Sequence, residues 1–388
     1  MDSLKKILFV VPVFNKSKGF GGVVTAISDY VQALRNHAKI TVYTSSILNL
    51  NYSIFTKSNP EYDSSGVTVK SFSSINFPKP AFVSVSMFFD ILKNYKSFDI
   101  VYISSIWQLI GPLTALACRL RKIPYIIAPH GSFSFKLRTK NIFIKKLYYR
   151  LFLKSIIKYS HSIHVTCENE ITDSKGWVLQ DKAVVVPNVL GDSISNEFYN
   201  PSLRKKLGLN DDDIIILNVG RADWKKRNDL IINSLLKDSR LNFVFVGDYQ
   251  NPIGSSWLNL VKKHNLSDRV FFTGHKSKNE LDFYYKGSDI FVLLSENENF
   301  GLVVGEAIIS ECKVVVSKEV GIGEYLTDFS TVKIIDKENE IDDVLISEYT
   351  KSKKNHNVGE LKDNKFKILD RLGYESVGKL FMKNFFNE

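Results

Sequence analysis

Short apolar runs alternate with amphipathic segments along the chain. In the first half the apolar runs are KILFVVPVF, KITVYTS, FDIVYIS, PYIIAP, SIHVTC and AVVVP. Segments with helical periodicity, such as VVTAISDYVQAL, lie between them. Buried strands that alternate with amphipathic helices are typical of a parallel sheet with crossover helices. The first half is therefore predicted to be an α/β domain.

The same alternation restarts after Asn200, with apolar runs at DIIILNVG, FVFVG, RVFFTG, DIFVLLS, KVVVS and TVKIID. A chain of 388 residues exceeds the size at which one hydrophobic core usually stops growing, so two domains are expected. Glycine, proline and small polar residues cluster between Gly191 and Leu209, which places the boundary there. The predicted fold class is α/β, with two doubly wound, Rossmann-like parallel-sheet domains at 1–195 and 196–372.

The final segment, YESVGKLFMKNFFNE, is amphipathic and aromatic. It is predicted to form a helix at about 373–388 that packs back on the first domain. A helix that packs within the second domain fits the pattern nearly as well.

Composition narrows the class of protein. Hydrophobic content is 44% and charged content is 24%, which are ordinary values for a soluble globular protein. The opening MDSLKKILFVVPVF has a short apolar run that is interpreted as the first strand and not as a signal peptide or membrane span. Cys118, Cys167 and Cys312 lack metal-ligand spacing, which favours buried thiols in a reducing, cytoplasmic compartment.

The net charge of +11 comes from one region. No Asp or Glu occurs from Ile100 to Cys167, whereas eleven Lys and Arg do, and the rest of the chain is balanced. Such a region is expected to face an anionic surface or substrate. Nucleic acid is not favoured as the partner, because no recognised binding motif accompanies the charges.

Residues 140–159, KNIFIKKLYYRLFLKSIIKY, interleave basic and apolar residues. On a helix, Ile142, Leu147, Leu151 and Ile156 would share a broad apolar side, with the lysines elsewhere. Such a helix can lie in a membrane interface, and the absence of acids favours contact with the anionic inner face of the cell membrane. A core helix whose lysines extend to solvent is the alternative.

Two glutamates, Glu298 and Glu306, flank the expected start of a helix within FVLLSENENFGLVVGEAIISECKVVV, at 291–316. A strand, a polar loop and a helix that opens at Phe300-Gly301-Leu302 would direct backbone N–H groups at an anion such as a diphosphate. Glu306 would lie about one turn into the helix, where a carboxylate can accept from both hydroxyls of a ribose. Two glutamates at this spacing also arise by chance, and Glu306 could be an ordinary exposed residue.

Other candidates follow strands of the two predicted sheets, where ligands of parallel α/β proteins usually bind. Arg221 and Lys226, in GRADWKKRND, offer cations to a diphosphate, although a solvated basic loop is the simpler interpretation. His130, after PYIIAP, can hydrogen-bond a sugar hydroxyl, or it is merely structural. Gly21 and Gly22 open a helix, where glycines allow a phosphate or sugar to approach the backbone or simply serve a turn.

Taken together, these motifs resemble a known family. The segments VGR followed by Lys226, GDY after FVFV, FTGH, S-x-x-E-x-F-G-L-x-x-x-E-A and G-x-x-E resemble retaining glycosyltransferase family 4, which has the GT-B fold. APHG and the Gly-Gly pair of the first loop resemble its amino-terminal half. The resemblance covers most of the chain and is strongest from Ile214 to Leu326. It implies a metal-independent transferase that moves a sugar with retention in surface-polysaccharide or glycolipid synthesis.

The resemblance also implies roles in binding the donor, a nucleotide sugar linked to UDP or GDP. Glu306 is similar to the ribose-binding glutamate and Glu298 to its partner near the donor sugar. Phe300, Gly301 and Leu302 would meet that sugar and the β-phosphate through their backbone. Arg221 and Lys226 resemble the diphosphate clamp.

In the first domain, His130 resembles the histidine that touches the donor sugar, and Gly22 the glycine whose N–H approaches the phosphate. With Gly21 they are the candidate contacts of the acceptor, a glycan or lipid-linked sugar. The catalytic candidates are His130, Glu298, Arg221 and Lys226. The departing phosphate can itself accept the proton of the acceptor hydroxyl.

Several positions depart from the family pattern. Arg227 stands where glycine usually follows the lysine, Val189 where glycine usually follows Pro-Asn, and Trp224 adds bulk to the diphosphate loop. They keep open the alternative of a nucleotide-sugar-binding protein without turnover. Asp211-Asp212-Asp213 contains an Asp-x-Asp pattern, but it precedes a strand, so a solvated turn is predicted and no metal or other cofactor is expected.

Overall fold

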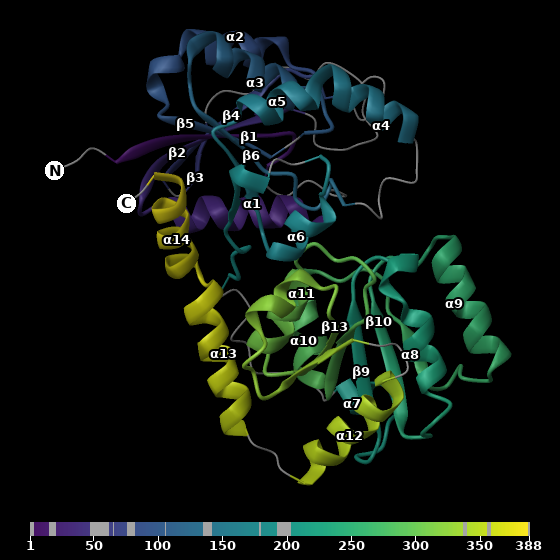
Figure 1. Cartoon of the computed structure of the whole chain (residues 1–388). Coiled ribbons are helices and arrows are strands. Elements are labelled where there is room, and N and C mark those ends of the chain that lie inside the picture. The colour runs from purple at the N-terminus through teal and green to yellow at the C-terminus, as the bar shows by residue number, and fades with distance from the viewer. Residues whose placement is uncertain are drawn as a thin grey trace. The chain divides into compact units, whose positions relative to one another are not determined.

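The structure of the chain is a computed structural model. It describes residues 4–14, 21–46, 62–64, 66–75, 82–104, 106–134, 142–177, 180–191, 203–336, 340–354 and 358–386. The chain divides into two compact units (Figure 1). Unit 1 comprises Met1–Gly191 with Leu372–Glu388, and unit 2 comprises Asp192–Arg371. Most of the predicted boundary segment, and Lys136, Arg138 and Lys140 of the basic stretch, lie outside the described residues.

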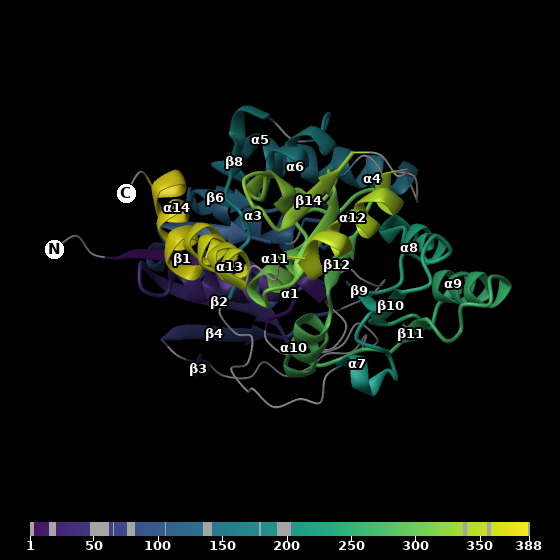
Figure 2. The same cartoon turned by 90° about the horizontal axis from the view of Figure 1, so that it is seen from below.

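Unit 1 is built on an eight-stranded sheet with the order β3-β4-β2-β1-β5-β6-β7-β8. Figure 2 labels β3, β4, β2 and β1 of this sheet. All pairings are parallel except that between β3 and β4. The strands are β1 (Lys5–Val11), β2 (Ala38–Ser45), β3 (Tyr62–Ser64), β4 (Val67–Phe72), β5 (Ile100–Ile103), β6 (Tyr125–Ile127), β7 (Ser162–Val165) and β8 (Ala183–Val185). The parallel sheet predicted from the apolar runs is confirmed.

Alternate residues of each strand enter different cores. Leu8 and Val10 face one core, and Ile7, Phe9 and Val11 face the other, as the period of a strand requires. The helices of unit 1 are α1 (Gly21–Leu34), α2 (Val85–Lys93), α3 (Ile110–Arg121), α4 (Ile142–Tyr148), α5 (Lys154–Tyr159), α6 (Glu168–Asp173) and α14 (Tyr374–Phe386), with short helical segments η1 (Tyr95–Ser97), η3 (Tyr149–Leu153) and η4 (Gln180–Lys182). α2, α3 and α5 cover the first core, and α1 and α14 cover the second.

The helix α14 packs against α1 within unit 1. Its buried residues Val377, Phe381 and Phe385 join the core that contains Tyr30. At Gly378 an added Cβ would lie 2.6 Å from the backbone oxygen of Ala33, so only glycine permits this close helix contact. The end of the chain is therefore part of the first hydrophobic core and not of the second.

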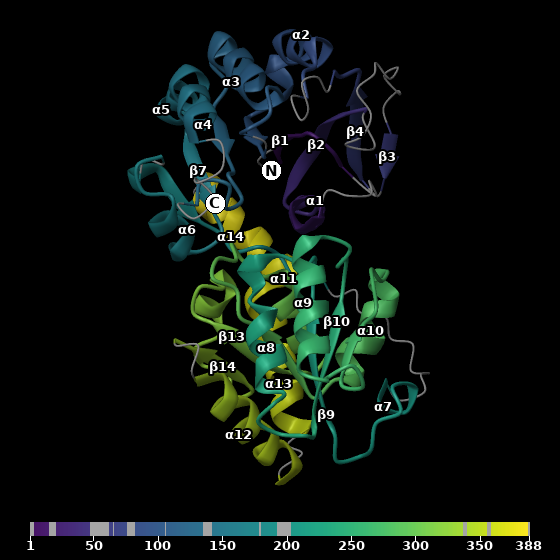
Figure 3. The same cartoon turned by 90° about the vertical axis from the view of Figure 1, so that its right-hand side faces the viewer.

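Unit 2 has a six-stranded parallel sheet with the order β11-β10-β9-β12-β13-β14 (Figure 3). The strands are β9 (Ile214–Val219), β10 (Leu241–Val246), β11 (Val270–Phe272), β12 (Ile290–Leu293), β13 (Lys313–Ser317) and β14 (Val332–Ile335). The helices are α7 (Leu203–Lys206), α8 (Asn228–Ser234), α9 (Pro252–Lys263), α10 (Lys278–Gly287), α11 (Leu302–Ile309), α12 (Ile341–Lys354) and α13 (Val358–Leu372), with η5 (Trp224–Lys226) and η6 (Gly321–Tyr325). Buried residues of α8, α9 and α12 form one core with the sheet.

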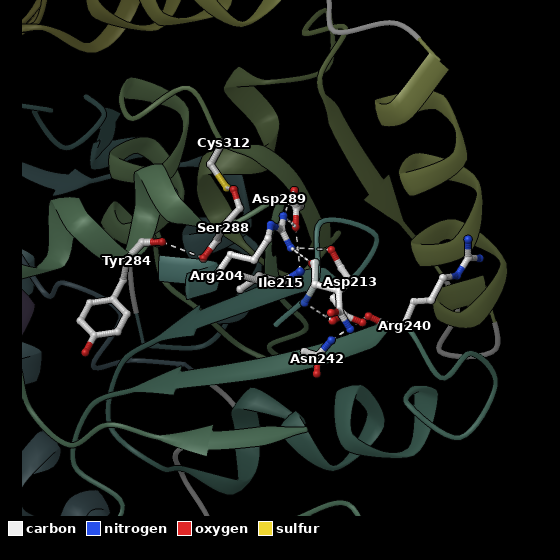
Figure 4. A network of polar contacts seen from close by, with 10 residues as sticks. Arg204, Asp213, Ile215, Arg240, Asn242, Tyr284, Ser288, Asp289 and Cys312 are labelled. Carbon is white, nitrogen blue, oxygen red and sulfur yellow. Dashed lines mark hydrogen bonds and ion pairs between the residues drawn. The ribbon is translucent and has the colours of Figure 1, made fainter. Parts of the chain in front are cut away.

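A polar network occupies the amino ends of these strands (Figure 4). Arg204 donates to both carboxylate oxygens of Asp289 at 3.1 and 3.0 Å and to the backbone oxygen of Asp213 at 2.6 Å. Asp289 also accepts from the backbone N–H of Ile215 at 2.8 Å. Asp213 accepts from the N–H of Asn210, so its carboxylate closes a turn, as predicted for Asp211-Asp212-Asp213. These contacts engage the charged side chains of this edge with one another and with the backbone.

Candidate functional site

Three loops meet at the carboxyl edge of the unit 2 sheet. The loop after β9 and the loop after β12 are joined by the N–H of Glu296, which donates to the backbone oxygen of Lys225 at 2.8 Å. The loops after β12 and β13 are joined by three more backbone bonds. The N–H of Gly321 donates to the oxygen of Glu298 at 3.1 Å, that of Ile322 to Phe300 at 2.7 Å, and that of Glu298 to Glu319 at 3.3 Å. The loops that carry the predicted donor residues are therefore fastened to one another through their backbones.

The structure brings Lys226 and Glu298 together. The Nζ atom of Lys226 lies 3.4 Å from Oε2 of Glu298, and both side chains are half-buried. Gly220, at the end of β9, makes this possible, because an added Cβ would lie 3.0 Å from Nζ and Cε of the lysine. Its φ of +142° is also a conformation that other residues rarely adopt. The result is a cation beside a carboxylate in the loops at the carboxyl edge of the sheet.

The turn into α11 is formed as predicted at Phe300, Gly301 and Leu302. Phe300 is buried, and Gly301 caps the helix with a φ of +90°. A Cβ at Gly301 would lie 2.8 Å from Cγ1 of Val320, so the position has neither the conformation nor the space for a side chain. The first N–H groups of a helix have no partner within it, so this terminus offers donors to an anion.

Glu306 is half-buried in α11 and not an ordinary exposed residue. Its Oε2 atom accepts a hydrogen bond of 2.9 Å from the hydroxyl of the buried Tyr285, which α10 supplies. Burial raises the pKa of Glu306, and the Tyr285 hydrogen bond opposes that rise. Tyr285 therefore orients one carboxylate oxygen and helps to keep the group ionised, as a hydrogen-bond acceptor for a diol requires.

Arg221 is not drawn into this cluster. Its side chain is 74% exposed, and its nearest carboxylate is that of Asp223, at 3.9 Å. Of the two predicted clamp cations, Lys226 is thus fixed beside Glu298 and Arg221 extends into solvent. Trp224 is also exposed, at 49%.

Arg227 explains one departure from the family pattern. Its backbone lies in the left-handed region, with φ +49° and ψ +37°, which glycine adopts without strain. Its guanidinium pairs with Glu296 at 2.9 Å and with Asp229 at 3.4 Å. The ion pair to Glu296 adds a side-chain link between the loops after β9 and β12. The glycine-like position after Lys226 was the only signal of this arrangement in the sequence.

In unit 1, the candidate His130 follows β6 in a left-handed turn, with φ +47° at His130 and +74° at Gly131. The Nε2 atom of His130 is buried and has no hydrogen-bond partner among the described residues. Burial, and to a lesser degree His164, lower the pKa of His130 to about 3, so the ring is neutral near pH 7. A neutral imidazole with an unpaired nitrogen is suited to a hydroxyl group.

Glu170 fixes this turn and was not recognised from the sequence. Its buried carboxylate accepts from the N–H of Gly131 at 2.6 Å, from the N–H of Thr166 at 2.8 Å and from the Thr166 hydroxyl at 3.0 Å. It thereby joins the loops that follow β6 and β7. Its only sequence signal was an acidic residue in the first turn of a helix, which usually marks capping.

Gly21 and Gly22 form the first turn of α1, after β1. No atom lies within 4 Å of a Cβ added at Gly22, so packing does not require glycine there. Val189 is fully buried in the core shared with α1 and α14. This second departure from the family pattern therefore serves packing.

The basic segment is helical from Ile142 to Tyr159, but η3, at its centre, is a π-helix. The prediction that Ile156 shares an apolar side with Ile142, Leu147 and Leu151 was wrong. Ile156 is buried in the core, whereas the other three are 43%, 49% and 62% exposed. The wider π turn shifts the phase of the helix between its two ends.

Phe143 and Ile144, which the pattern did not single out, are the most exposed apolar residues of this segment, at 79% and 66%. Together with Leu147 and Leu151 they form an apolar surface beside Lys146 and Arg150, which are also exposed. Among the described residues, no helix is long and apolar enough to cross a membrane. Within the same residues, no group of three or more His, Cys, Asp or Glu is arranged to hold a metal ion.

Comparison with known proteins bears on both units. Residues 200–362 match the family model described as "Glycosyl transferases group 1". The O-antigen biosynthesis glycosyltransferase WclY of Escherichia coli is 26% identical over 220 residues, which are 56% of this chain and 60% of that protein. N,N'-diacetylbacillosaminyl-diphospho-undecaprenol alpha-1,3-N-acetylgalactosaminyltransferase of Campylobacter jejuni is 29% identical over 257 residues, 60% of this chain and 64% of that protein.

The chain thus spans about 60% of the length of these curated relatives. The crystal structure of Anabaena Alr3699/HepE in complex with UDP-glucose is similar to this fold, with a TM-score of 0.70 at 15% identity over 96% of this chain and 97% of that one. The resemblance noted in the motifs is confirmed for residues 200–362, which are similar to the group 1 glycosyltransferases, and the chain has the GT-B fold.

Proposed function

We propose that the chain transfers a sugar from a nucleotide diphosphate sugar to a glycan or lipid-linked sugar acceptor, in the synthesis of a cell-surface polysaccharide or glycolipid. Two curated relatives support this class of reaction, since one is named for O-antigen biosynthesis and the other for a diphospho-undecaprenol acceptor. We assign binding of the donor to unit 2 and binding of the acceptor to unit 1.

The observation that carries the proposal is the cluster at the carboxyl edge of unit 2, where Lys226 pairs with Glu298 beside the amino end of α11. A diphosphate needs cations and N–H donors, which Lys226 and this helix terminus supply. Glu306 then accepts from the ribose hydroxyls, with Tyr285 orienting one of its oxygens. Arg221, which extends into solvent, is free to turn towards a phosphate.

The proposed reaction proceeds with retention. The acceptor hydroxyl attacks the anomeric carbon on the face from which the diphosphate leaves, the bond to the leaving oxygen breaks, and that oxygen accepts the hydroxyl proton. Lys226 and the α11 terminus stabilise the charge that develops on the phosphate. His130, neutral because burial lowers its pKa, offers a hydrogen-bonding nitrogen to a sugar hydroxyl and carries no charge. No metal is required in this scheme.

A panel of UDP-, GDP-, ADP- and CDP-sugars, screened by thermal stabilisation, tests the donor assignment. One nucleotide class should raise the unfolding midpoint of the protein. Glu306→Gln keeps the shape of the side chain but removes a charged acceptor. The affinity for that nucleotide, measured by calorimetry, should therefore fall about tenfold. Glu311→Gln, which removes a carboxylate paired with Lys365 elsewhere in unit 2, is the matched control.

Equal nucleotide affinity in Glu306→Gln and the control would contradict the donor site. Incubation of the protein with the preferred donor and a lipid-linked acceptor tests turnover. Donor binding with neither sugar transfer nor slow donor hydrolysis would indicate a binding protein and not an enzyme. The anomeric configuration of the product, read by NMR, tests retention. Activity that EDTA abolishes and magnesium restores would contradict a metal-independent reaction.

We further propose that the exposed surface of α4 and η3 contacts the anionic inner face of the cell membrane, so that the protein is cytoplasmic and peripheral. Phe143, Ile144, Leu147 and Leu151 supply the apolar area. The eleven Lys and Arg between Ile100 and Cys167, without one Asp or Glu, supply the attraction to anionic lipid, at about 1 kcal/mol for each residue near the surface.

Flotation with phosphatidylglycerol vesicles tests this surface. The double variant Phe143→Ser/Ile144→Ser should lower the partition coefficient about tenfold or more, since two large apolar side chains no longer enter the lipid. Phe366→Ser is the control, because Phe366 is 70% exposed on α13 in unit 2. No flotation of the wild type, or equal loss in the control, would contradict membrane contact.

A further inference from the structure

Unit 1 contains a cavity of about 390 Å³ that none of the proposed donor or acceptor residues line. It lies on the face of the sheet that α2 and α3 cover further along the strands. Lys6 and Lys39 stand near the amino ends of β1 and β2, and η1 borders the opening. The candidate ligand residues of unit 1 follow the carboxyl ends of its strands, so the cavity belongs to the other edge of the sheet.

Strand register explains why its lysines converge. Lys6 is paired with Lys39 across β1 and β2, and Thr41 is paired with Thr68 across β2 and β4. Side chains two residues apart share a face, so Lys39 and Thr41 point to one side of β2, and Thr68 and Lys70 to the same side of β4. Tyr43 and Phe72, the next residues on that face, enter the core under α2 and α3. Where these helices end, the polar residues are left to line a concavity.

The cavity is strongly basic. Among the residues that the structure describes, Lys6, Lys39, Lys70 and Lys96 line it, and no Asp or Glu does. Lys70 is neutralised by Asp90, to which it donates at 2.6 Å. Among the described residues, Lys6, Lys39 and Lys96 have no carboxylate within 4 Å of their ammonium groups, and all three are exposed.

Two nearby carboxylates do not alter this balance. Burial raises the pKa of Asp90, but hydrogen bonds from Lys70, Tyr43 and Asn94 together hold it below its usual value, so it stays ionised and committed to Lys70. Asp99 accepts from the backbone N–H of Lys6 at 2.7 Å. Three ammonium groups around one cavity thus remain available to a ligand.

We propose that this cavity is a second anion-binding site, separate from the donor site, for a compact ligand with more than one negative charge on phosphate. Three lysines supply charge, and Thr41, Thr68 and Ser97 supply hydroxyl donors for the remaining phosphate or sugar oxygens. The volume lies at the lower end of small-ligand sites, which fits pyrophosphate or a monosaccharide phosphate and excludes an extended polymer inside it.

Calorimetry with inorganic pyrophosphate on the full chain tests the proposal, in the presence of saturating donor nucleotide so that unit 2 is occupied. One equivalent should bind to the wild type. Lys39→Ala/Lys96→Ala should weaken it about tenfold or more, because two charge-assisted contacts are lost. Lys93→Ala/Lys237→Ala removes the same charge from exposed lysines that do not line the cavity and should bind as the wild type does.

No binding, binding that the donor nucleotide abolishes, or equal weakening in both double variants would overturn the proposal. The last result would show general attraction to a basic surface. Titration of glucose 1-phosphate and of inorganic phosphate then distinguishes a sugar phosphate from a free anion as the ligand. None of these results depends on sugar transfer, so the proposed function stands or fails separately.

Discussion

The carboxyl edges of the two sheets are built in different ways. In unit 2, charged side chains join the loops, Lys226 to Glu298 and Arg227 to Glu296. In unit 1, a buried glutamate, Glu170, fastens backbone N–H groups, and the side chain that it presents, His130, is neutral. The difference matches the proposed ligands, since a diphosphate needs charge held in position and a sugar hydroxyl needs only an oriented polar atom.

Removal of the unit 2 cation should have the largest effect. Lys226→Ala takes away a donor to the diphosphate and leaves Glu298 without its partner, so we expect a loss of about 3 kcal/mol in nucleoside diphosphate binding, or roughly a hundredfold. Lys225→Ala, at the neighbouring lysine, should bind normally. Calorimetry compares the two, and equal affinities would remove Lys226 from the site.

The unit 1 edge should respond in turnover and not in donor affinity. Glu170→Gln replaces one of two accepting oxygens by an NH₂ group that faces donors, which loosens the His130 turn at a cost of about 1–3 kcal/mol. We expect kcat to fall about tenfold while nucleoside diphosphate affinity, measured by calorimetry, is unchanged. Restoration by Glu170→Asp would support positioning of the turn, whereas a parallel loss of nucleotide binding would contradict it.

The two edges should also differ in how pH changes stability. The pKa of His130 is lowered to about 3 in the folded chain, so its contribution is present above its unfolded pKa, near 6.5, and is lost as pH falls towards 3. The pKa of Glu306 is raised, so the folded state binds its proton more readily and stability falls as pH rises from the unfolded pKa through the folded one.

Unfolding midpoints of His130→Asn and Glu306→Gln, each subtracted from the wild type between pH 4 and 7, measure these slopes. The histidine difference should increase with pH and the glutamate difference should decrease. Slopes of the same sign would show that at least one of the two groups does not titrate as its burial implies.

The smallest effect is expected at Arg227. Arg227→Gly removes the strain of a left-handed backbone but also removes the ion pair to Glu296. The two effects on the free energy of unfolding should nearly cancel. Arg227→Ala loses the pair without gaining glycine's freedom and should be about 1 kcal/mol less stable than Arg227→Gly by urea unfolding. Equal stability of the two variants would mean that the loop relaxes to another backbone conformation.

The sequence predicted the strands, the two sheets and the turn at Phe300-Gly301-Leu302, because apolar periodicity and glycine positions are local signals. It did not predict the partners of the candidate residues. Tyr285 and Glu306 are 21 positions apart on different helices, and Glu170 and Gly131 are 39 apart. Contacts of this kind depend on how helices and strands pack in three dimensions. The pattern of apolar and polar residues along one segment carries no information about that packing.

The basic segment shows a different limit. Helical periodicity assumes 3.6 residues per turn, and a π-helix at Tyr149–Leu153 breaks that assumption. The pattern therefore placed Ile156 with the exposed residues, although it is buried. The exposure of Phe143 and Ile144 likewise depends on which part of the segment packs against the core. The sequence pattern alone does not determine this.

The packing of α14 on α1 has a consequence for biosynthesis. The ribosome delivers the amino terminus first, yet Phe381 and Phe385 complete the core around Tyr30. The core of unit 1 therefore stays incomplete, with apolar residues exposed, until all of unit 2 has left the ribosome. Its folding during translation should consequently be the slower of the two, and a nascent chain arrested before Tyr374 should be recognised by chaperones that bind exposed apolar surface.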